Sequence, residues 1–360
     1  MLIIDGAYGE GGGQILRTAL ALAALLTWPV RIDHIRAGRK NPGLAAQHLT
    51  AVQAATMICD ASVTGAKLGS TQLTFEPQCP PLAGLYEFDV AQARIGGSAG
   101  AATLVLQTIL LPLVWAGQAS MVTVKGGTHV AWSPTFHYFR DVYLPALAGL
   151  GIEAAATLSA WGWYPAGSGA ITLETAGGWS LSKQGLPDQG AGFDLGAGRG
   201  RLKQITGAAV AADLPAHIAQ RMCNRALNLL QQAALAATIE PQRVRSQSPG
   251  AGIFLLAEYE TSRAGFSALG RKGKPSEVVA EEAVEALLAF HHTEAVVDPY
   301  LADQLILPLA LAGFSGELRA ERLSRHILTN IWVVEQFLGP VADVDHRRQL
   351  IRFNASHRNT

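Results

Sequence analysis

The stretch DGAYGEGGGQILR, residues 5–17, decides how this chain begins to fold. The apolar residues 2–4 before it predict a short strand, and the Ala- and Leu-rich residues 14–26 predict a helix. The glycines between them allow a tight turn from strand to helix. Backbone amides at such a turn, with the positive end of the helix, can also bind an anion. The spacing matches neither a Walker loop nor a dinucleotide fingerprint, so the pattern supports a structural turn and an anion site equally.

Two other short segments later in the chain also lead directly into predicted apolar helices. Residues 95–100 lead into a predicted helix at 101–115, and residues 300–304 open one that runs to 312. A helix that is apolar on every side is buried, so we expect these helices to form an inner layer against sheets. The predicted fold class is α/β (α+β), with a repeated α/β unit.

The composition and the pattern of predicted elements change between about residues 185 and 290. A glycine-rich stretch is followed by a predicted strand near 205–211 and by predicted helices at 216–236 and 276–290. We expect three regions: residues 1–184 with 291–340 as the large domain, 185–290 as an inserted small α/β domain, and 341–360 as a C-terminal strand and a loose tail.

Composition restricts the classes of function. Of 360 residues, 49% are hydrophobic and 16% charged, which excludes wholesale disorder. Twenty-eight basic residues balance 28 acidic ones, so any polyanion must be met by a local cluster of charge. The widely spaced Cys59, Cys79 and Cys223 predict reduced thiols and no structural zinc. Because we find neither a signal peptide nor a membrane span, we predict a soluble, cytoplasmic protein with no membrane partner.

Charged residues near the first turn are the first candidates for chemistry. Glu10 would repel a phosphate unless a divalent cation lay between them, and Mg²⁺ is held by one or two carboxylates plus substrate phosphates. The alternative is a solvated loop glutamate. Arg36, Arg39 and Lys40 precede a predicted helix, and Arg17 lies one turn into the first helix. Guanidinium groups match phosphate, so a phosphate site is favoured over a basic surface loop.

Polar residues at the apolar helices are the second candidates. Gln107 must find hydrogen-bond partners in its apolar run or cost ~1–3 kcal/mol, and a backbone group could serve as well as a ligand. Asp303 and Gln304 open another apolar helix, where Asp303 could also complement the helix dipole. Tyr300 could stack on a base or simply pack. His326 precedes a further predicted helix, and a lone histidine is more often structural.

Together these motifs resemble the RNA 3′-terminal phosphate cyclase family, whose N-terminal signature is similar to residues 5–17. The resemblance runs from about residue 2 to 338 in the family's order and is weaker across 185–270. Departures from the family occur at ERLSR (321–325), which is more basic, and at GTHVAW (127–132). Further matching blocks are IRAGR (35–39), PGL (42–44), QHLTAV (47–52), GSAG (97–100), LVLQT (104–108), YPAGSG (164–169), YLADQ (300–304) and HILTN (326–330).

The resemblance implies a fold and a reaction. The large domain would hold three repeated units, each with two helices on a four-stranded sheet, interrupted by the smaller domain. The enzyme would use ATP to convert the 3′-phosphate of an RNA into a 2′,3′-cyclic phosphate, releasing AMP and pyrophosphate. The reaction would pass through a covalent histidyl-AMP enzyme and an adenylylated RNA 3′ end. The oligomeric state stays open, a homodimer included.

The resemblance also implies roles for individual residues. His326 would be the nucleophile that carries AMP, and its presence argues against the non-catalytic branch of the family, which lacks this histidine. Glu10 would hold the divalent metal, Mg²⁺ or Mn²⁺. Pro134 and Tyr300 would sandwich the adenine. Binding of ATP would involve Gln107, Pro134, Tyr300, Leu301, Ala302, Asp303 and Gln304. The phosphates of ATP and of the RNA end would meet Arg17, Arg36, Arg39, Gln47 and His48.

Two other classes of function remain open from the sequence. One is a non-catalytic RNA-binding scaffold on this fold, which would not take covalent label from the α-phosphate of ATP. The other is a related phosphoryl or enolpyruvyl transferase, for which small anionic substrates and not RNA ends would stimulate turnover.

Overall fold

The computed structural model describes residues 1–94, 97–178, 195 and 198–354. Its first unit is a four-stranded sheet in the order β1-β2-β4-β3, with β1 and β2 parallel. The strands are β1 (Leu2–Asp5), β2 (Val30–Asp33), β3 (Ser62–Thr64) and β4 (Leu73–Glu76), and the helices between them are α1 (Gly13–Leu26) and α2 (Ala46–Cys59).

The second unit repeats this strand order as β5-β6-β8-β7. Residues 136–148 are helical and widen into a π-helix in the middle. The strands are β5 (Leu85–Asp89), β6 (Ser120–Gly126), β7 (Ala154–Ala160) and β8 (Gly169–Thr175). The helical segments are η1 (Val90–Ala93), α3 (Ala102–Trp115), α4 (Phe136–Tyr138), η2 (Phe139–Tyr143) and α5 (Leu144–Ala148).

The third unit has a three-stranded sheet in the order β13-β15-β14. Where the other units have a first strand, Val297 forms a single parallel bridge to Ala320. The elements are α8 (Pro299–Leu311), β13 (Gly316–Arg319), α9 (Arg325–Leu338), β14 (Ala342–Asp345) and β15 (Leu350–Phe353).

The prediction of a loose tail was wrong for residues 350–353. These residues form β15, the middle strand of the third sheet, and Leu350, Ile351 and Phe353 are buried. Apolar burial therefore anchors this segment to the third unit. The rest of the expected tail, residues 355–360, lies outside the described residues, as do residues 185–194 at the expected start of the insert.

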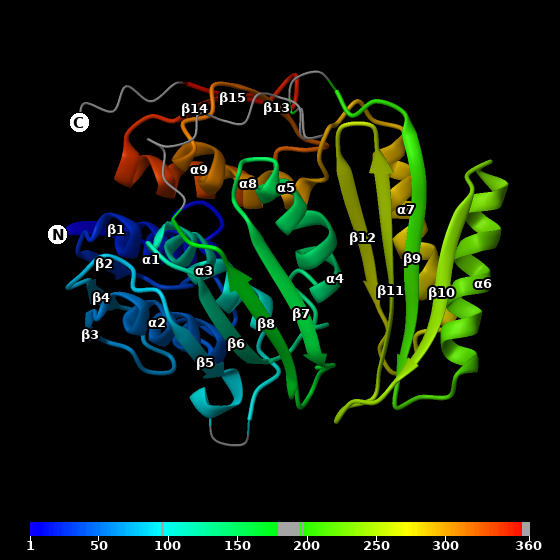
Figure 1. The fold of residues 1–360 in the computed structure, drawn as a ribbon, viewed down its shortest axis with the longest axis horizontal. Coiled ribbons are helices and arrows are strands. Elements are labelled where there is room, and N and C mark those ends of the chain that lie inside the picture. The colour runs from blue at the N-terminus through cyan, green and yellow to red at the C-terminus, as the bar shows by residue number, and fades with distance from the viewer. Residues whose placement is uncertain (95–96, 179–194, 196–197, 355–360) are drawn as a thin grey trace.

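Buried helices form the interior of these three units, as the apolar patterns predicted. α1, α3 and α8 are almost wholly buried, and Figure 1 shows them inside the part of the molecule that the three sheets surround. Their small and branched side chains share one continuous apolar core. Since each helix is covered on all sides, the polar residues near its ends are directed toward the other buried helices. No helix in the described parts of the chain is long and apolar enough to cross a membrane.

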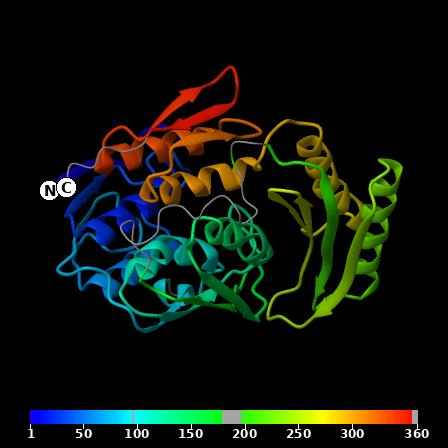
Figure 2. The same ribbon diagram turned by 45° about the horizontal axis from the view of Figure 1, so that its top comes forward.

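Residues 202–291 form a further sheet with a core of its own. The strand order is β10-β9-β11-β12, and both helices of this segment cover the face that points away from the three units (Figures 1 and 2). The elements are β9 (Leu202–Ala212), α6 (His217–Gln232), β10 (Ala237–Val244), β11 (Gly250–Tyr259), β12 (Arg263–Leu269) and α7 (Ser276–His291).

Asp298 joins this sheet to the start of α8. Its Oδ1 accepts hydrogen bonds from the amides of Tyr300 and Leu301 at 2.9 and 3.0 Å, which caps α8. The same oxygen accepts from the Tyr138 hydroxyl at 2.7 Å, and Oδ2 accepts from the Gly265 amide of β12 at 3.4 Å. Burial raises the pKa of Asp298 to about 6, although all of these donors favour the ionised form.

We predict that Asp298→Ala lowers the free energy of unfolding by about 2–4 kcal/mol, because it removes a helix cap and leaves the buried Tyr138 hydroxyl without its acceptor. Tyr138→Phe should cost only about 1 kcal/mol, since Asp298 keeps its three amide donors. Urea unfolding followed by circular dichroism measures both values. Equal losses for the two variants would contradict the capping role.

Candidate active site

Glu10 lies at the centre of a charged cluster beside the start of α1. Its carboxylate forms an ion pair with Arg39, from the loop before α2, and contacts Nδ1 of His326 on α9. Both carboxylate oxygens are buried, and neither accepts a hydrogen bond of regular geometry. A buried carboxylate is costly unless cations or donors compensate it, so Glu10 ties three segments of the chain together.

The glycine-rich turn is shaped by its contact with α9. Gly9 has a φ of 57°, and a Cβ there would lie 2.3 Å from Oγ1 of Thr329. The same Oγ1 accepts from the amide of Glu10 at 3.2 Å, and the ring of Tyr8 stacks on Trp332 with centroids 3.9 Å apart. The turn therefore needs glycine for its conformation, and it also delivers Glu10 to His326.

His326 lies in the first turn of α9, whereas the sequence placed it just before the helix. The Ser324 side chain caps this helix by accepting from the Ile327 amide at 3.3 Å. The His326 side chain is 53% exposed. Because Nδ1 faces the Glu10 carboxylate, the ring proton lies on Nδ1 and the lone pair on Nε2.

The surroundings of His326 favour the neutral imidazole. Burial, together with the positive charges of Arg17 and Arg39, lowers the pKa of His326 below its ordinary value, although the Asp303 carboxylate acts in the opposite direction. A neutral ring with a free nitrogen is the nucleophilic form of histidine at physiological pH.

A buried polar network connects α1, α8 and α9 behind this histidine. Asn330 donates from Nδ2 to the carbonyl of Asp303 at 2.9 Å and to its Oδ1 at 3.3 Å. Its Oδ1 accepts from the Thr18 hydroxyl at 2.7 Å. Sequence reasoning assigned no role to Thr18 or Asn330. Asn330 follows His326 by four residues, so the two share a face of α9, and this spacing was the available signal.

The residues expected to bind the nucleotide differ in their exposure to solvent. Gln107 on α3 donates to Gln304 on α8 at 2.7 Å, and Gln304 donates to the Tyr300 carbonyl at 3.0 Å. The Tyr300 ring is 63% exposed, which leaves one flat face available for stacking. Leu301 and Ala302 differ, because their side chains are buried and their amides already donate to Asp298. The structure therefore places these two in the core.

Pro134 lies near the beginning of α3. Its carbonyl accepts a hydrogen bond from the Thr103 hydroxyl at 2.8 Å. Thr103 lies one turn before Gln107 on α3. The predicted adenine sandwich between Pro134 and Tyr300 stays a prediction.

His48 and Arg17 flank the first residue of α1. A Cβ on Gly13 would lie 2.3 Å from Nε2 of His48 and 3.2 Å from Nη1 of Arg17. Burial, Arg17 and Arg36 lower the pKa of His48 to about 3, so the ring is neutral. Since Nδ1 accepts from the Ala45 amide at 3.2 Å, the proton lies on Nε2, which is a donor aimed at this point.

Gln47 and Arg36 are held by backbone groups. Oε1 of Gln47 accepts from the Ala101 amide at 2.9 Å, so its NH₂ group stays available as a donor. Nη1 of Arg36 donates to the Gly43 carbonyl at 2.7 Å, and burial lowers the pKa of Arg36. Arg36 thus supports the loop 36–43 besides any part in ligand binding.

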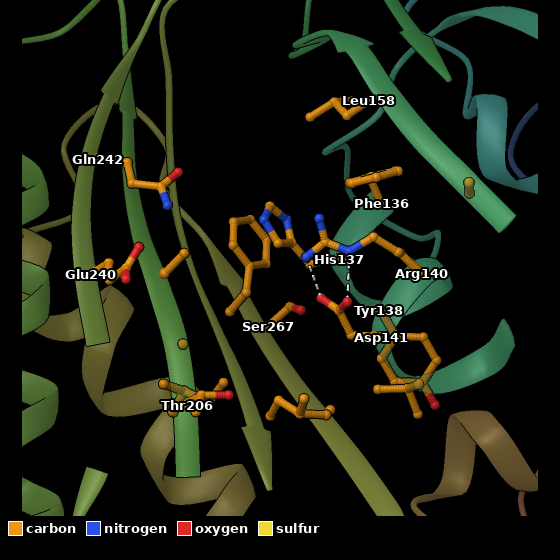
Figure 3. A pocket seen from close by; sticks show the side chains of 18 of the residues that line it. Phe136, His137, Tyr138, Arg140, Asp141, Leu158, Thr206, Glu240, Gln242 and Ser267 are labelled. Atoms are coloured by element: carbon orange, nitrogen blue, oxygen red, sulfur yellow. Dashed lines mark hydrogen bonds and ion pairs between the residues drawn. The ribbon is translucent and has the colours of Figure 1, made fainter. Parts of the chain in front are cut away.

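A large cavity lies elsewhere in the molecule. It measures about 640 Å³ and separates α4 and η2 from the sheet of residues 202–269. In Figure 3, His137 and Arg140 lie on one side and Thr206, Glu240 and Gln242 on the other, and Arg140 is paired with Asp141 at 2.6 Å. None of the predicted site residues lines it. A second cavity of about 30 Å³ is lined by four residues of the predicted site and its polar network, Arg17, Gln107, Gln304 and Asn330.

Comparison with known proteins agrees with the resemblance seen in the sequence. The sequence profile of the family described as "RNA 3'-terminal phosphate cyclase" matches residues 8–344. This chain belongs to that family. It is 50% identical to the RNA 3'-terminal phosphate cyclase of Gloeothece citriformis over 360 residues, which cover 100% of both chains.

Further members of the cyclase family are similar over nearly their full length. The protein of this name from Methylococcus capsulatus is 52% identical over 94% of this chain and 91% of its own. The one from Pyrococcus furiosus is 40% identical over 96% of this chain and 95% of its own. The likeness therefore extends over both the charged cluster and residues 202–291.

We predict that Gly9→Ala lowers the free energy of unfolding by about 1–3 kcal/mol, because the new Cβ meets Thr329 and the residue has a positive φ. Gly38→Ala is the matched control, since a Cβ at Gly38 meets no atom within 4 Å. Differential scanning calorimetry compares them. If Gly9→Ala melts at the wild-type temperature, the turn does not depend on its contact with α9.

Proposed function

We propose that this member of the cyclase family converts an RNA 3′-phosphate into a 2′,3′-cyclic phosphate at the expense of ATP, with His326 as the nucleophile. One observation carries the assignment of His326: a half-exposed imidazole is fixed through Nδ1 by a buried carboxylate and keeps Nε2 free. Membership of the family supports the reaction.

In the first step, Nε2 of His326 attacks the α-phosphorus of ATP. A P–N bond forms, the bond from the α-phosphorus to the bridging oxygen breaks, and pyrophosphate leaves. The Glu10 carboxylate stabilises the positive charge that develops on the ring, because it lies against the Nδ1–H group of His326. Covalent catalysis of this kind divides one difficult phosphoryl transfer into easier steps.

The next two steps regenerate the histidine and close the ring. An oxygen of the RNA 3′-phosphate attacks the phosphorus of the histidyl-AMP, the P–N bond breaks, and the RNA end becomes adenylylated. A phosphate monoester lacks a useful leaving group, and the bound AMP now supplies one. The 2′-hydroxyl then attacks the 3′-phosphorus, AMP departs, and the hydroxyl proton passes to the AMP phosphate or to water.

Several groups of this chain fit the phosphates of these substrates. Arg17 and the Nε2–H of His48 point to the same place beside Gly13. α1 begins there without a side-chain cap, so its first amides are free to bind an anion. We assign Arg17, Arg36, Arg39, Gln47 and His48 to the phosphates of ATP and of the RNA end.

The nucleoside of ATP fits the opposite side of the cluster. The exposed face of Tyr300 can stack on adenine, with Pro134 as its predicted partner. The side-chain amides of Gln107 and Gln304 hydrogen bond to each other. The Asp303 carboxylate is close enough to His326 to interact with it electrostatically. The buried residues Leu301 and Ala302, also predicted to bind ATP, support this wall from the core.

Glu10 is suited to a divalent cation, Mg²⁺ or Mn²⁺. Its two buried oxygens lack regular hydrogen bonds, and within the described residues no group of three His, Cys, Asp or Glu side chains could hold a metal. Such a site, with one carboxylate plus phosphate oxygens and water, is the usual arrangement for Mg²⁺ at a nucleotide. The cation would neutralise charge on the triphosphate.

We place the reaction in the cytoplasm, where ATP is available and where buried thiols such as Cys59 and Cys223 remain reduced. The non-catalytic scaffold is the second candidate, and the arrangement of His326 disfavours it, because binding alone needs no free imidazole nitrogen.

We predict that His326→Asn keeps the fold but slows cyclisation of 3′-phosphorylated RNA by several orders of magnitude, roughly the loss seen when a covalent catalyst loses its nucleophile. The same variant should still close the ring of chemically adenylylated RNA, because that step uses the 2′-hydroxyl. Gel analysis of both substrates checks this. A variant that is inactive on both would place His326 in ring closure instead.

We also predict the pH dependence of covalent AMP formation from ATP alone. The neutral ring is the reactive form and its pKa is lowered, so the rate should be constant from alkaline pH down to about 6.5 and fall only at more acidic pH. Single-turnover rates at saturating ATP measure it. A midpoint above 6.5 would mean that the pKa of His326 is raised and not lowered.

A further inference from the structure

Two exposed aromatic residues lie outside the site described so far. Trp132 is 99% exposed and has a φ of 66°, and Tyr164 is 76% exposed. A tryptophan in this left-handed conformation is strained, and a ring so exposed returns no energy from packing. The strained backbone of Trp132 and the exposure of both rings would be explained by a ligand that stacks on the flat faces of the rings.

Hydrogen bonds connect the loops that carry these residues to the phosphate cluster. The amide of Thr128 donates to the Gly162 carbonyl at 2.9 Å, which joins the Trp132 loop to the Tyr164 loop. The amide of Gly127 donates to the Gly100 carbonyl at 2.8 Å. The next residue, Ala101, donates to Gln47 at 2.9 Å. These hydrogen bonds thus link the segment around Gln47 to the loops that carry both aromatic residues.

Similar links continue onto the sheet of residues 202–269. The amide of Ala166 donates to the Ser248 hydroxyl at 3.0 Å, and Trp161 forms a bridge to Ser246. Arg245, next to this bridge, is exposed and forms no ion pair with any described residue. An exposed arginine therefore lies in the segment that hydrogen bonds to the Tyr164 loop.

We propose that Trp132 and Tyr164 are a stacking platform for the bases that precede the 3′-terminal nucleotide, and that Arg245 contacts a phosphate of the same strand. This inference rests on the proposed function and specifies its substrate as a single-stranded RNA end. Aromatic faces beside a cation are the usual means of binding single strands without reading sequence.

The surroundings of the two rings favour RNA over a protein partner. The exposed residues Ala131 and Ser168, close to the two rings in the sequence, are small or polar and add little to a continuous apolar patch. A protein interface would centre on such a patch. A base-paired RNA end keeps its bases stacked on each other, so the platform also predicts weaker binding of duplex ends.

The test compares substrates with and without upstream bases. With a single-stranded oligonucleotide of about eight nucleotides bearing a 3′-phosphate, Trp132→Ala and Tyr164→Ala should each raise KM about fivefold to a hundredfold, the range for loss of one base stack. With cytidine 3′-monophosphate, which has no upstream base, KM should not change. Trp132→Phe and Tyr164→Phe should restore the wild-type KM. Trp28→Ala, which removes another exposed tryptophan, is the matched control.

Three results would overturn the proposal. Equal rises in KM for the oligonucleotide and the mononucleotide would make the residues part of the terminal-phosphate site. Unchanged KM for the oligonucleotide would leave the platform without a role. A change in oligomeric state by light scattering, with KM unchanged, would mark a protein interface.

A binding measurement separates this proposal from the proposed function. Fluorescence anisotropy of a labelled 3′-phosphorylated oligonucleotide requires no ATP and no turnover. If the wild type forms no covalent AMP but binds the oligonucleotide about fivefold to a hundredfold more tightly than the alanine variants, the platform stands and the cyclase mechanism fails. If the wild type and these variants bind equally, the platform is wrong whatever the catalytic result.

Discussion

The burial of one carboxylate constrains the whole arrangement of the site. Glu10 is out of water, so the chain must bring cations or donors to it, and it brings Arg39 from before α2 and His326 from α9. These segments can meet only if the glycine-rich turn lies against α9, which Gly9 and Thr329 permit. The same contact that compensates the charge orients the imidazole for attack.

The repeated units explain how distant residues reach this point. Three buried helices, α1, α3 and α8, come from different units, and α9 packs beside α1 and α8. Because their sides are apolar, their few polar residues meet one another, as in the hydrogen bonds from Thr18 to Asn330 and from Gln107 to Gln304. A ligand placed among them would contact all three units at once.

The sequence predicted the elements with strong local signals. The buried helices were evident from apolar runs, and the helix predicted at 276–290 ends one residue later, at His291. The sequence predicted one C-terminal strand followed by a loose tail, and β15 lies in the expected tail, because four residues beside a polar, arginine-containing turn become a strand only through pairing with β13 and β14. For the site, residue types suggested Glu10 and His326. Their contact, and the burial of Leu301 in the core, depend on tertiary packing that no local pattern encodes.

The central claim is that Nε2 of His326 receives AMP. The most direct measurement is to incubate the full-length protein with ATP and a divalent cation, digest it under non-acidic conditions, and locate the adenylate by mass spectrometry. The account predicts a single modified peptide that contains His326, with the AMP lost on mild acid treatment as expected of a phosphoramidate. Stable label on a lysine, or label on His48, would contradict it.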